Sequence, residues 1–295
     1  MSRRGSNKEL AQTPISAADI EKYAVEQSDL AFEMEILRLV KQNCSGETRW
    51  GGLYYDPHTG KQRQYDIQTE LPSQPFSPQN WIKLAIECKH LKPNYPLVVC
   101  CTPRNGHEQF IDVWQWPPMA EEHFALDENG NAVHCAAISD PHYRRHICSP
   151  TLFYSLNRPV GRSLDQVGKN GEGDWITEDS SIFDKWSQAL ASLHSLLDDT
   201  LTCNRPGNHW NLVFLPVVVV PDGTLWQINY SSNGQQTEPP KQVNSIRYWV
   251  DITYNFDKGL RKESYRISHL HFFTKTGLAN FLNDRDALLD AFQGY

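Results

Sequence analysis

The chain has 295 residues, enough for one large domain or two modest ones with a well-buried core. Apolar residues make up 39% and charged residues 21%, a composition that excludes an intrinsically disordered chain. The formal net charge of −7 argues against a protein that coats nucleic acid through its overall charge, so any phosphate contact must be local. Apolar runs such as Leu97–Cys101 and Val217–Val220 are far shorter than the roughly 20 residues that span a bilayer. We therefore expect neither a membrane segment nor a secretion signal.

Seven cysteines occur in the chain, at positions 44, 88, 100, 101, 135, 148 and 203. Their odd number and the lack of any CxxC or zinc-finger spacing argue against a disulfide framework and a structural zinc site. This usage predicts a reduced, cytoplasmic protein. Cys100 and Cys101 end the apolar run LVVCC, which is typical of a buried strand, so we expect both thiols to be inert packing groups.

The N-terminal region predicts two helices. Residues 1–15 are polar and aperiodic, and we expect a flexible lead-in there. A serine cap begins a short predicted helix over residues 16–27, and a longer helix follows over residues 28–43.

A hairpin and two strands are predicted next. Tyr54 and Tyr55 lead into DPHTG at residues 56–60, where proline presets a turn and glycine closes it. Residues 61–69 form the returning strand. Further strands are predicted over residues 81–89 and 95–102, which gives the order helix, hairpin, strand, strand.

The rest of the chain is less regular. Residues 103–180 are rich in Pro, Gly, His and Asn and show weak periodicity, whereas residues 181–199 have apolar side chains at helical spacing. Three further predictions are a strand, tight turn and strand over residues 211–230, a strand over 245–252 and a closing helix over 274–292.

No linker divides the chain, and we expect residues 16–295 to form a single elaborated α/β domain. Arg144–His146 and the segment Arg158–Lys169 are either local phosphate contacts or ordinary solvated loops. The stretch GRSLDQVGKNGEGDW has four glycines but no Gly-Lys-Ser/Thr, which favours a mobile loop over a nucleotide-binding P-loop.

Alternation along residues 81–89 separates an apolar face from a charged one. The apolar face has Ile82, Leu84, Ile86 and Cys88. The charged face has Trp81, Lys83, Ala85, Glu87 and Lys89. A carboxylate and an ammonium therefore lie side by side at the end of this strand.

Asp66 can join this pair if the returning strand of the hairpin pairs with residues 81–89. Two adjacent carboxylates repel each other unless a cation lies between them, and Mg²⁺ prefers carboxylate oxygens and water as ligands. A neighbouring lysine can orient or help to deprotonate a water, a chemistry suited to phosphodiester hydrolysis. Glu70 has the same strand parity as Asp66, but Leu71-Pro72 suggests that the strand has ended there.

The second helix offers a third carboxylate. At about 100° per residue, Glu33 falls inside the apolar arc that contains Leu30, Leu37 and Val40, whereas Glu35 falls outside it. A carboxylate among core-facing residues is costly unless it has a partner. We therefore choose Glu33, with Glu35 as the alternative because the opposite side of the helix is also partly apolar.

Glu33 on the helix, Asp66 after the hairpin and Glu87-Cys88-Lys89 at a strand end resemble the PD-(D/E)xK nuclease superfamily, which has the restriction-endonuclease-like fold. The segments AFEMEILRLV, YYDPHTGKQRQYDI and LAIECKHLKP are similar to an uncharacterised, mostly microbial group within it. The resemblance covers about residues 28–102 and departs from the superfamily name at Tyr65, where that name has proline.

The resemblance implies an α/β fold with an αβββαβ core at residues 28–102 and a mixed central sheet, elaborated by an extension over residues 103–295. It further implies Mg²⁺, or Mn²⁺, held by Asp66, Glu87 and the backbone carbonyl of Cys88, a water positioned by Lys89, and Glu33 as an outer acid. The expected function is metal-dependent endonuclease cleavage of DNA in restriction, defence or repair, with RNA not excluded as a substrate.

Three alternatives stay open. Glu87 and Lys89 could form a weak ion pair on a solvated strand face. The fold could instead serve as an inactive module that binds nucleic acid or regulates a larger complex. The protein could also act as a homodimer, or as a subunit that cuts only within a complex or when a ligand binds to residues 103–295.

Overall fold

The computed structural model describes residues 13–26, 28–56, 59–74, 77–116, 120–126, 132–138, 142–146, 154–178, 180–202, 210–258 and 261–284. Most of the predicted flexible segment of residues 1–15 lies outside these ranges, as does the predicted helical segment beyond residue 284.

Four α-helices and one short 3₁₀ helix occur in the described part of the chain. The helices are α1 (Ala17–Glu26), α2 (Asp29–Asn43), α3 (Ser180–Thr202), α4 (Lys275–Asn283) and the 3₁₀ helix Gly106–Glu108. The strands are β1 (Thr48–Trp50), β2 (Leu53–Asp56), β3 (Lys61–Gln64), β4 (Ile67–Gln74), β5 (Ser77–Cys88), β6 (Leu97–Thr102), β7 (Phe110–Trp116), β8 (Ala120–Leu126), β9 (Ala132–Ile138), β10 (His142–His146), β11 (Val160–Lys169), β12 (Trp175–Glu178), β13 (Trp210–Val220), β14 (Leu225–Asn229), β15 (Lys241–Gln242), β16 (Ser245–Lys258) and β17 (Arg261–Thr274).

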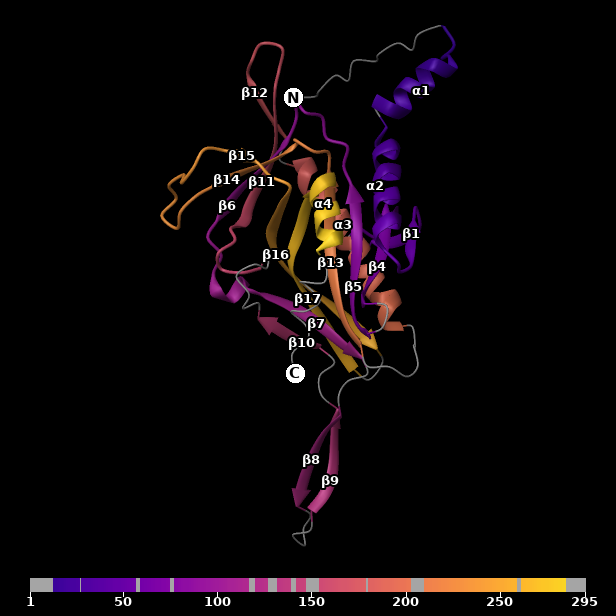
Figure 1. Ribbon diagram of the computed structural model, residues 1–295, viewed down its shortest axis with the longest axis vertical. Helices are drawn as coiled ribbons and strands as arrows, with labels where there is room; N and C mark the ends of the chain where they lie inside the picture. Colours follow the sequence, from indigo (N-terminus) through magenta and orange to yellow (C-terminus); the bar gives the residue numbers. More distant parts are fainter. Residues whose placement is uncertain are drawn as a thin grey trace.

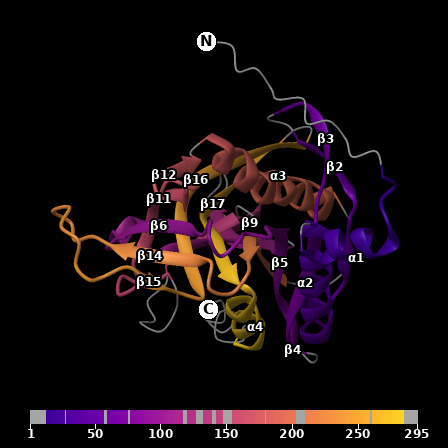
Figure 2. The same ribbon diagram turned by 90° about the horizontal axis from the view of Figure 1, so that it is seen from above.

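The protein is an α/β protein built on a large mixed sheet. Among the described residues, 13 strands form this sheet, with the main order β1-β4-β5-β13-β17-β16-β11-β6-β14-β15. Helices α2 and α4 cover one face and α3 covers the other, as the view from above shows (Figure 2). Strands β8 and β9 form a separate hairpin that projects from the body of the molecule (Figure 1).

Alternation along β5 separates two cores, as predicted. Ile82, Leu84, Ile86 and Cys88 are buried in the core that includes α2 and α4. Ala85, which has the opposite parity, packs with the leucines of α3. Because β5 lies inside the sheet with a helix on each side, its charged face is also covered, and Lys83 and Glu87 are buried.

A helix and a strand far along the chain complete the centre of the sheet. Strand β5 pairs antiparallel with β4 and parallel with β13, which follows directly after α3. The helix and strand that follow β4 and β5 in the centre of the sheet are therefore α3 and β13, from much later in the chain. The predicted core range of residues 28–102 contains no helix after β5, because β6 follows β5 without one.

The hairpin forms as predicted, but its returning strand is interrupted. Strands β2 and β3 pair as a separate two-stranded sheet. The predicted strand over residues 61–69 breaks at Tyr65 and Asp66, where Tyr65 N donates to Gly52 O at 3.0 Å and Gly51 N donates to Asp66 O at 3.1 Å. A side chain at Gly52 would collide with Tyr65, since a Cβ there would lie 2.2 Å from the tyrosine hydroxyl oxygen.

Strands β13 and β14 do not pair with each other, although the predicted turn between them exists. Thr224 N donates to Pro221 O at 3.3 Å, and Gly223 adopts a φ of 78°. Strand β13 instead lies between β5 and β17, and β14 pairs with β6 and β15. The four valines Val217–Val220 are all fully buried, as expected of a strand covered on both faces.

Two segments expected as loops are strands. Residues 158–169, expected as a solvated loop, contain β11, and Arg144–His146 lie in β10. At Gly161 a Cβ would lie 2.8 Å from Val99 and 2.9 Å from Tyr248, so the close packing there requires glycine. Because glycine is uncommon inside strands, this residue hid the strand from the sequence pattern. The proposed mobile loop of residues 161–175 is therefore wrong over residues 161–169, which lie in β11, and at Trp175, which begins β12.

Candidate active site

The predicted acidic residues and lysine meet where β5 ends and β4 begins, between α2 and α3. The register pairs Ile67 with Ile86, which sets Asp66, one residue before β4, across from Glu87. The pairing on which the approach of Asp66 to Glu87 depended is therefore present from Ile67 onward, although residues 61–64 do not take part in it.

Asp66 is fixed by the backbone of the neighbouring strand. Its Oδ2 accepts a hydrogen bond from Cys88 N at 2.7 Å. Burial raises the pKa of Asp66, and the carboxylate of Asp29 raises it further, against the opposing effects of the Cys88 N–H and Lys89. Asp66 thus has a set orientation, and its charged form is disfavoured.

Glu87 is buried beside Lys89. Lys89 Nζ donates to Glu87 Oε1 at 2.5 Å and to Gln188 Oε1 of α3 at 3.2 Å. Burial raises the pKa of Glu87 to about 7, with contributions from Asp66 and Glu33 and an opposing contribution from Lys89. Burial is thus the main reason that the ionised form of Glu87 is disfavoured, and the neighbouring acids add to this effect.

Lys89 remains an ammonium. Burial works against its charge, but Glu87, Asp66 and Asp29 outweigh that effect and raise the pKa of Lys89. A protonated lysine donates hydrogen bonds and cannot accept a proton. In this protonated form Lys89 can orient and neutralise neighbouring groups but cannot act as a base.

Helix α2 contributes Glu33 rather than Glu35. Burial raises the pKa of Glu33, followed by repulsion from Asp66 and Asp29, while a hydrogen bond with Trp50 and the charge of Lys89 lower it. Glu35 is exposed and forms an ion pair with Lys275 of α4. Glu33 therefore interacts with Asp66 and Lys89, and its role as the helix acid of a catalytic site stays a prediction.

The apolar arc used to select Glu33 is partly wrong. Leu30 is 51% exposed, whereas Phe32, which the arc did not include, is 7% exposed and packs in the core. Leu37 and Val40 are buried as expected. Glu33 is half-buried and falls between Leu37 and Val40 around the helix, and its carboxylate interacts with Asp66 and Lys89.

The side chain of Cys88 points away from the carboxylates into the core that α2 covers. Burial raises the pKa of its thiol well above the ordinary value, which keeps the sulfur protonated. The backbone carbonyl of Cys88 is consequently the group of this residue that can serve as a ligand, and its role as a metal ligand stays a prediction.

Tyr65 stands where the superfamily name has proline, and the structure gives a reason for this departure. Its backbone N–H donates to Gly52 O across the interruption between β3 and β4. A proline has no N–H to donate. The tyrosine is thus compatible with the position of Asp66 and contributes to it.

Glu70 is held in a separate ion pair. It lies opposite Lys83 in the register of β4 and β5, and the two side chains form a buried ion pair. Strand β4 continues to Gln74, so the expectation that the strand ends near Leu71-Pro72 is wrong. Glu70 fails as a substitute for Asp66 because it is engaged in the middle of the strand pair.

Sequence reasoning missed three neighbours of the site. Asp29 lies one helical turn before Glu33, and this i,i+4 spacing of acids was a usable signal. Gln188 belongs to α3, about 100 residues after Lys89, and no local pattern connects the two. The hydroxyl of Tyr54 donates to Gln188 O at 3.4 Å, and burial raises the pKa of this tyrosine, with Glu87 adding to the effect.

The described residues contain no group of three or more His, Cys, Asp or Glu side chains arranged to hold a metal ion. The candidate donor set is smaller, with two carboxylates and one backbone carbonyl. Asp29, Glu33, Asp66 and Glu87 nevertheless lie in each other's field around the Lys89 ammonium. This excess of negative charge and the hard oxygen donors suit Mg²⁺ or Mn²⁺, which commonly keep several water ligands.

Comparisons of the chain with protein-family models, curated proteins and solved structures gave no match. The function must therefore be inferred from the positions and chemistry of the residues themselves. None of the helices in the described ranges combines the length and apolar character needed to cross a membrane.

Proposed function

We propose that the protein is a metal-dependent nuclease that hydrolyses DNA phosphodiester bonds, with Asp66, Glu87 and Lys89 at its catalytic centre. The observation that supports this proposal best is the convergence of these three side chains at adjoining ends of two paired strands. Such a cluster of buried, perturbed groups is typical of functional sites.

The element order gives independent support. Helix α2, strands β1, β4 and β5, helix α3 and strand β13 occur along the chain in the order of an αβββαβ core, with the β2–β3 pair between β1 and β4. In the sheet, β1, β4, β5 and β13 are consecutive neighbours, with α2 on one face and α3 on the other (Figure 2). This arrangement is compatible with the PD-(D/E)xK resemblance, provided that residues 89–179 are an insertion within the core.

Asp66, Glu87 and the carbonyl of Cys88 would hold the divalent metal ion. The raised pKa of Glu87, about 7, supports this assignment because a bound cation would favour the ionised carboxylate. Such an ion would stabilise the negative charge that develops on the phosphate and would lower the pKa of a bound water.

The other residues would organise the reaction. Lys89, held by Glu87 and Gln188, can orient the attacking water or a phosphate oxygen through its remaining N–H group. Glu33 can accept a hydrogen bond from a water at the edge of the site. Because Lys89 remains protonated, the proton released by the attacking water must pass to a group other than this lysine.

A cleavage assay tests the proposal. Supercoiled plasmid, single-stranded DNA and RNA are each incubated with the protein and MgCl₂ or MnCl₂, with a chelator control. Wild-type protein should cleave DNA, whereas Asp66→Asn and Lys89→Met should not. Asp66→Asn keeps an oxygen for the Cys88 N–H and Lys89→Met keeps side-chain length, so both variants should retain the circular dichroism spectrum of the wild type.

Glu35→Gln is the matched control, because Glu35 lies on the same helix as Glu33 but is exposed and paired with Lys275. It should cleave at the wild-type rate. Undiminished cleavage by Asp66→Asn in a clean preparation would contradict the proposed site.

One observation favours a second candidate function, an inactive nuclease-like module that binds nucleic acid. Lys89 already provides an internal partner for Glu87, and Cys88 N provides one for Asp66. A site satisfied in this way can persist without metal. Calorimetric titration with MnCl₂ separates the two functions, because the nuclease should bind the ion through Asp66 and the inactive module should not.

A further inference from the structure

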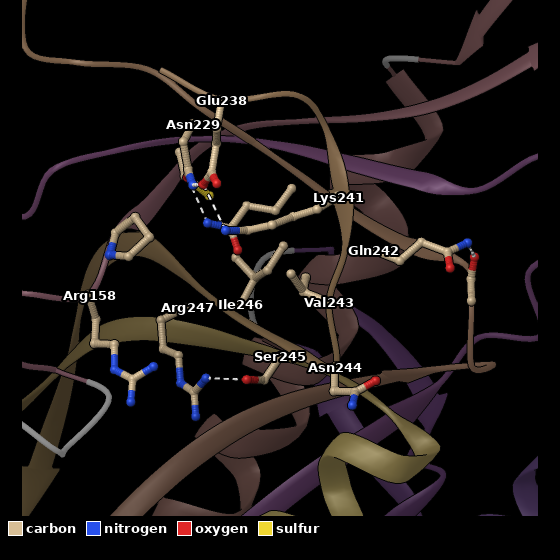
Figure 3. Close-up of a pocket in the computed structure, with 14 residues that line it drawn as sticks. Arg158, Asn229, Glu238, Lys241, Gln242, Val243, Asn244, Ser245, Ile246 and Arg247 are labelled. Atoms are coloured by element: carbon tan, nitrogen blue, oxygen red, sulfur yellow. Dashed lines mark hydrogen bonds and ion pairs between the residues drawn. The ribbon is translucent and has the colours of Figure 1, made fainter. Parts of the chain in front are cut away.

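A cavity of about 740 Å³ lies near β14, β15 and β16, toward the edge of the large sheet opposite to the edge near β4 and β5. It is formed by the end of β14, by residues 238–247, which include β15 and the start of β16, and by Arg158 and Pro159 before β11 (Figure 3). It shares no lining residue with the candidate active site, and β13 and β17 separate β5 from β16 in the sheet.

One wall of this cavity is cationic. Arg158 and Arg247 extend their guanidinium groups on the same side (Figure 3). Arg247 Nη1 donates to Ser245 Oγ at 2.7 Å, and its guanidinium carbon lies 5.2 Å from the centroid of the Phe273 ring. These contacts hold the Arg247 guanidinium in a defined orientation.

Arg247 is not a fully solvated arginine, and other arginines lie close to it. Burial, together with repulsion from Arg104 and Arg158, lowers the pKa of Arg247 to about 9, against the opposing effect of Tyr154. Burial likewise lowers the pKa of Arg104 to about 10, and Arg162 contributes to this effect. Both groups remain charged near neutral pH, so an anion beside Arg247 would relieve this repulsion.

The opposite wall is polar and internally paired. Glu238 accepts hydrogen bonds from Lys241 Nζ at 2.7 Å and from the side-chain amide of Asn229. Gln227 Nε2 donates to Asn229 Oδ1 at 2.6 Å. The charge of Lys241 is thus balanced locally, and the amides form an ordered surface for hydrogen bonding to a ligand.

We propose that this cavity binds a small phosphorylated ligand of nucleotide size, with its phosphate on Arg158 and Arg247 and its polar ring on the wall of Gln227 and Asn229. The planar fork of a guanidinium matches two phosphate oxygens. A volume of about 740 Å³ lies within the range of small-molecule sites. This inference does not depend on the proposed nuclease activity.

The same phosphate chemistry could come from a nucleic-acid backbone, but the second wall argues for a small ligand. A continuous backbone passing through the cavity would bring further phosphates toward the Glu238 carboxylate. A nucleotide instead has one charged end and one neutral polar end, which matches the difference between the two walls.

Binding measurements in the presence of a chelator test the inference. ATP, GTP, AMP and inorganic phosphate are titrated into wild-type protein and into Arg158→Ala and Arg247→Lys. At least one nucleotide should bind more tightly than inorganic phosphate, and each variant should weaken its binding about tenfold or more, the loss of one charge-assisted contact. Arg158 is exposed, so its removal should leave the fold intact, while Arg247→Lys retains the charge and removes the fork.

Arg38→Ala is the matched control, since it removes one exposed positive charge from α2 and should leave nucleotide affinity unchanged. The inference is overturned if no nucleotide binds more tightly than inorganic phosphate, or if Arg158→Ala and Arg247→Lys bind it as the wild type does. It is also overturned if short single-stranded DNA displaces the nucleotide and loses affinity in the same two variants, because the cavity would then be part of a nucleic-acid path.

Discussion

Two buried lysine–glutamate pairs lie along the same face of β5, and they differ in the charges around them. In the middle of the strand, Lys83 pairs with Glu70 directly across the register. At the end of the strand, Lys89 pairs with Glu87, but Asp66, Glu33 and Asp29 add negative charge.

The comparison separates a structural ion pair from a candidate catalytic one. Burying a charge is tolerated where a partner neutralises it, as Glu70 does for Lys83. Where acids outnumber the available ammonium, the remaining charge must be met by protonation or by another cation. We therefore expect the middle pair to support the fold and the end pair to support chemistry, and the following experiments test this division.

The largest expected difference is in catalysis. Glu87→Gln should reduce the rate of DNA cleavage on the order of 10³-fold, because it removes a charged ligand that acts on the reacting phosphate. Glu70→Gln should retain most of the activity when assayed at a temperature at which it is folded. Plasmid cleavage rates at saturating MgCl₂ measure both, and equal losses in the two variants would contradict the division.

The opposite pattern is expected in stability. Glu70→Gln leaves the buried Lys83 ammonium without its carboxylate partner and should cost about 3–5 kcal/mol in the free energy of unfolding. Urea denaturation followed by circular dichroism measures this cost. Glu47→Gln, which weakens the exposed pair with Arg49, is the control and should change stability by less than about 1 kcal/mol. If Glu70→Gln lowers the free energy of unfolding as little as Glu47→Gln does, the pair of Lys83 and Glu70 contributes little to stability.

The residues of the two pairs differ in how far sequence reasoning could reach. Alternation over residues 81–89 identified the face that bears Lys83, Glu87 and Lys89, because a strand inside the sheet strictly alternates between two cores. The hairpin before Asp66 further indicated that Asp66 would approach Glu87. Both inferences use contacts that are close in sequence.

Contacts between segments that lie far apart in the sequence could not be predicted in the same way. Gln188 reaches Lys89 only because β13 pairs in parallel with β5 after the crossover through α3, and no short pattern sets that pairing. Strand β17 was missed because His269 and His271, both buried, interrupt its apolar pattern. Arg158 was among the segments considered as local phosphate contacts, but its place beside Arg247 was missed for a related reason, since the two arginines lie about 90 residues apart and form no motif.

The burial of the acids at the end of β5, to which their mutual repulsion adds, also predicts how stability depends on pH. The pKa of Glu87 is about 7 in the folded protein against an ordinary value of 4.5, so the folded state holds a proton that the unfolded state has released over this window. Stability contributed by this group therefore falls as pH rises from about 4.5 to about 7. The raised pKa values of Asp66 and Glu33 act in the same direction.

Glu87→Gln should remove most of that dependence. In the absence of metal, wild-type protein should lose about 2–3 kcal/mol more of its free energy of unfolding than the variant does as the pH rises from about 5 to about 8. Urea denaturation at the two pH values measures this difference. A variant whose stability follows the wild type in parallel would show that Glu87 titrates normally in the folded protein.

The smallest expected effect concerns the cation itself. Millimolar MgCl₂ at about pH 8 should stabilise wild-type protein on the order of 1–3 kcal/mol, because an ion that binds only the folded state adds its binding free energy to folding. Thermal unfolding compared with NaCl at equal ionic strength measures the shift, and Asp66→Asn should abolish it while Glu35→Gln should not. Glu70→Gln should also keep the shift, since its effect on stability arises in the middle of β5. A shift that persists in Asp66→Asn would mean that the ion binds elsewhere, and the excess acids at the end of β5 would then have to be balanced by protons alone.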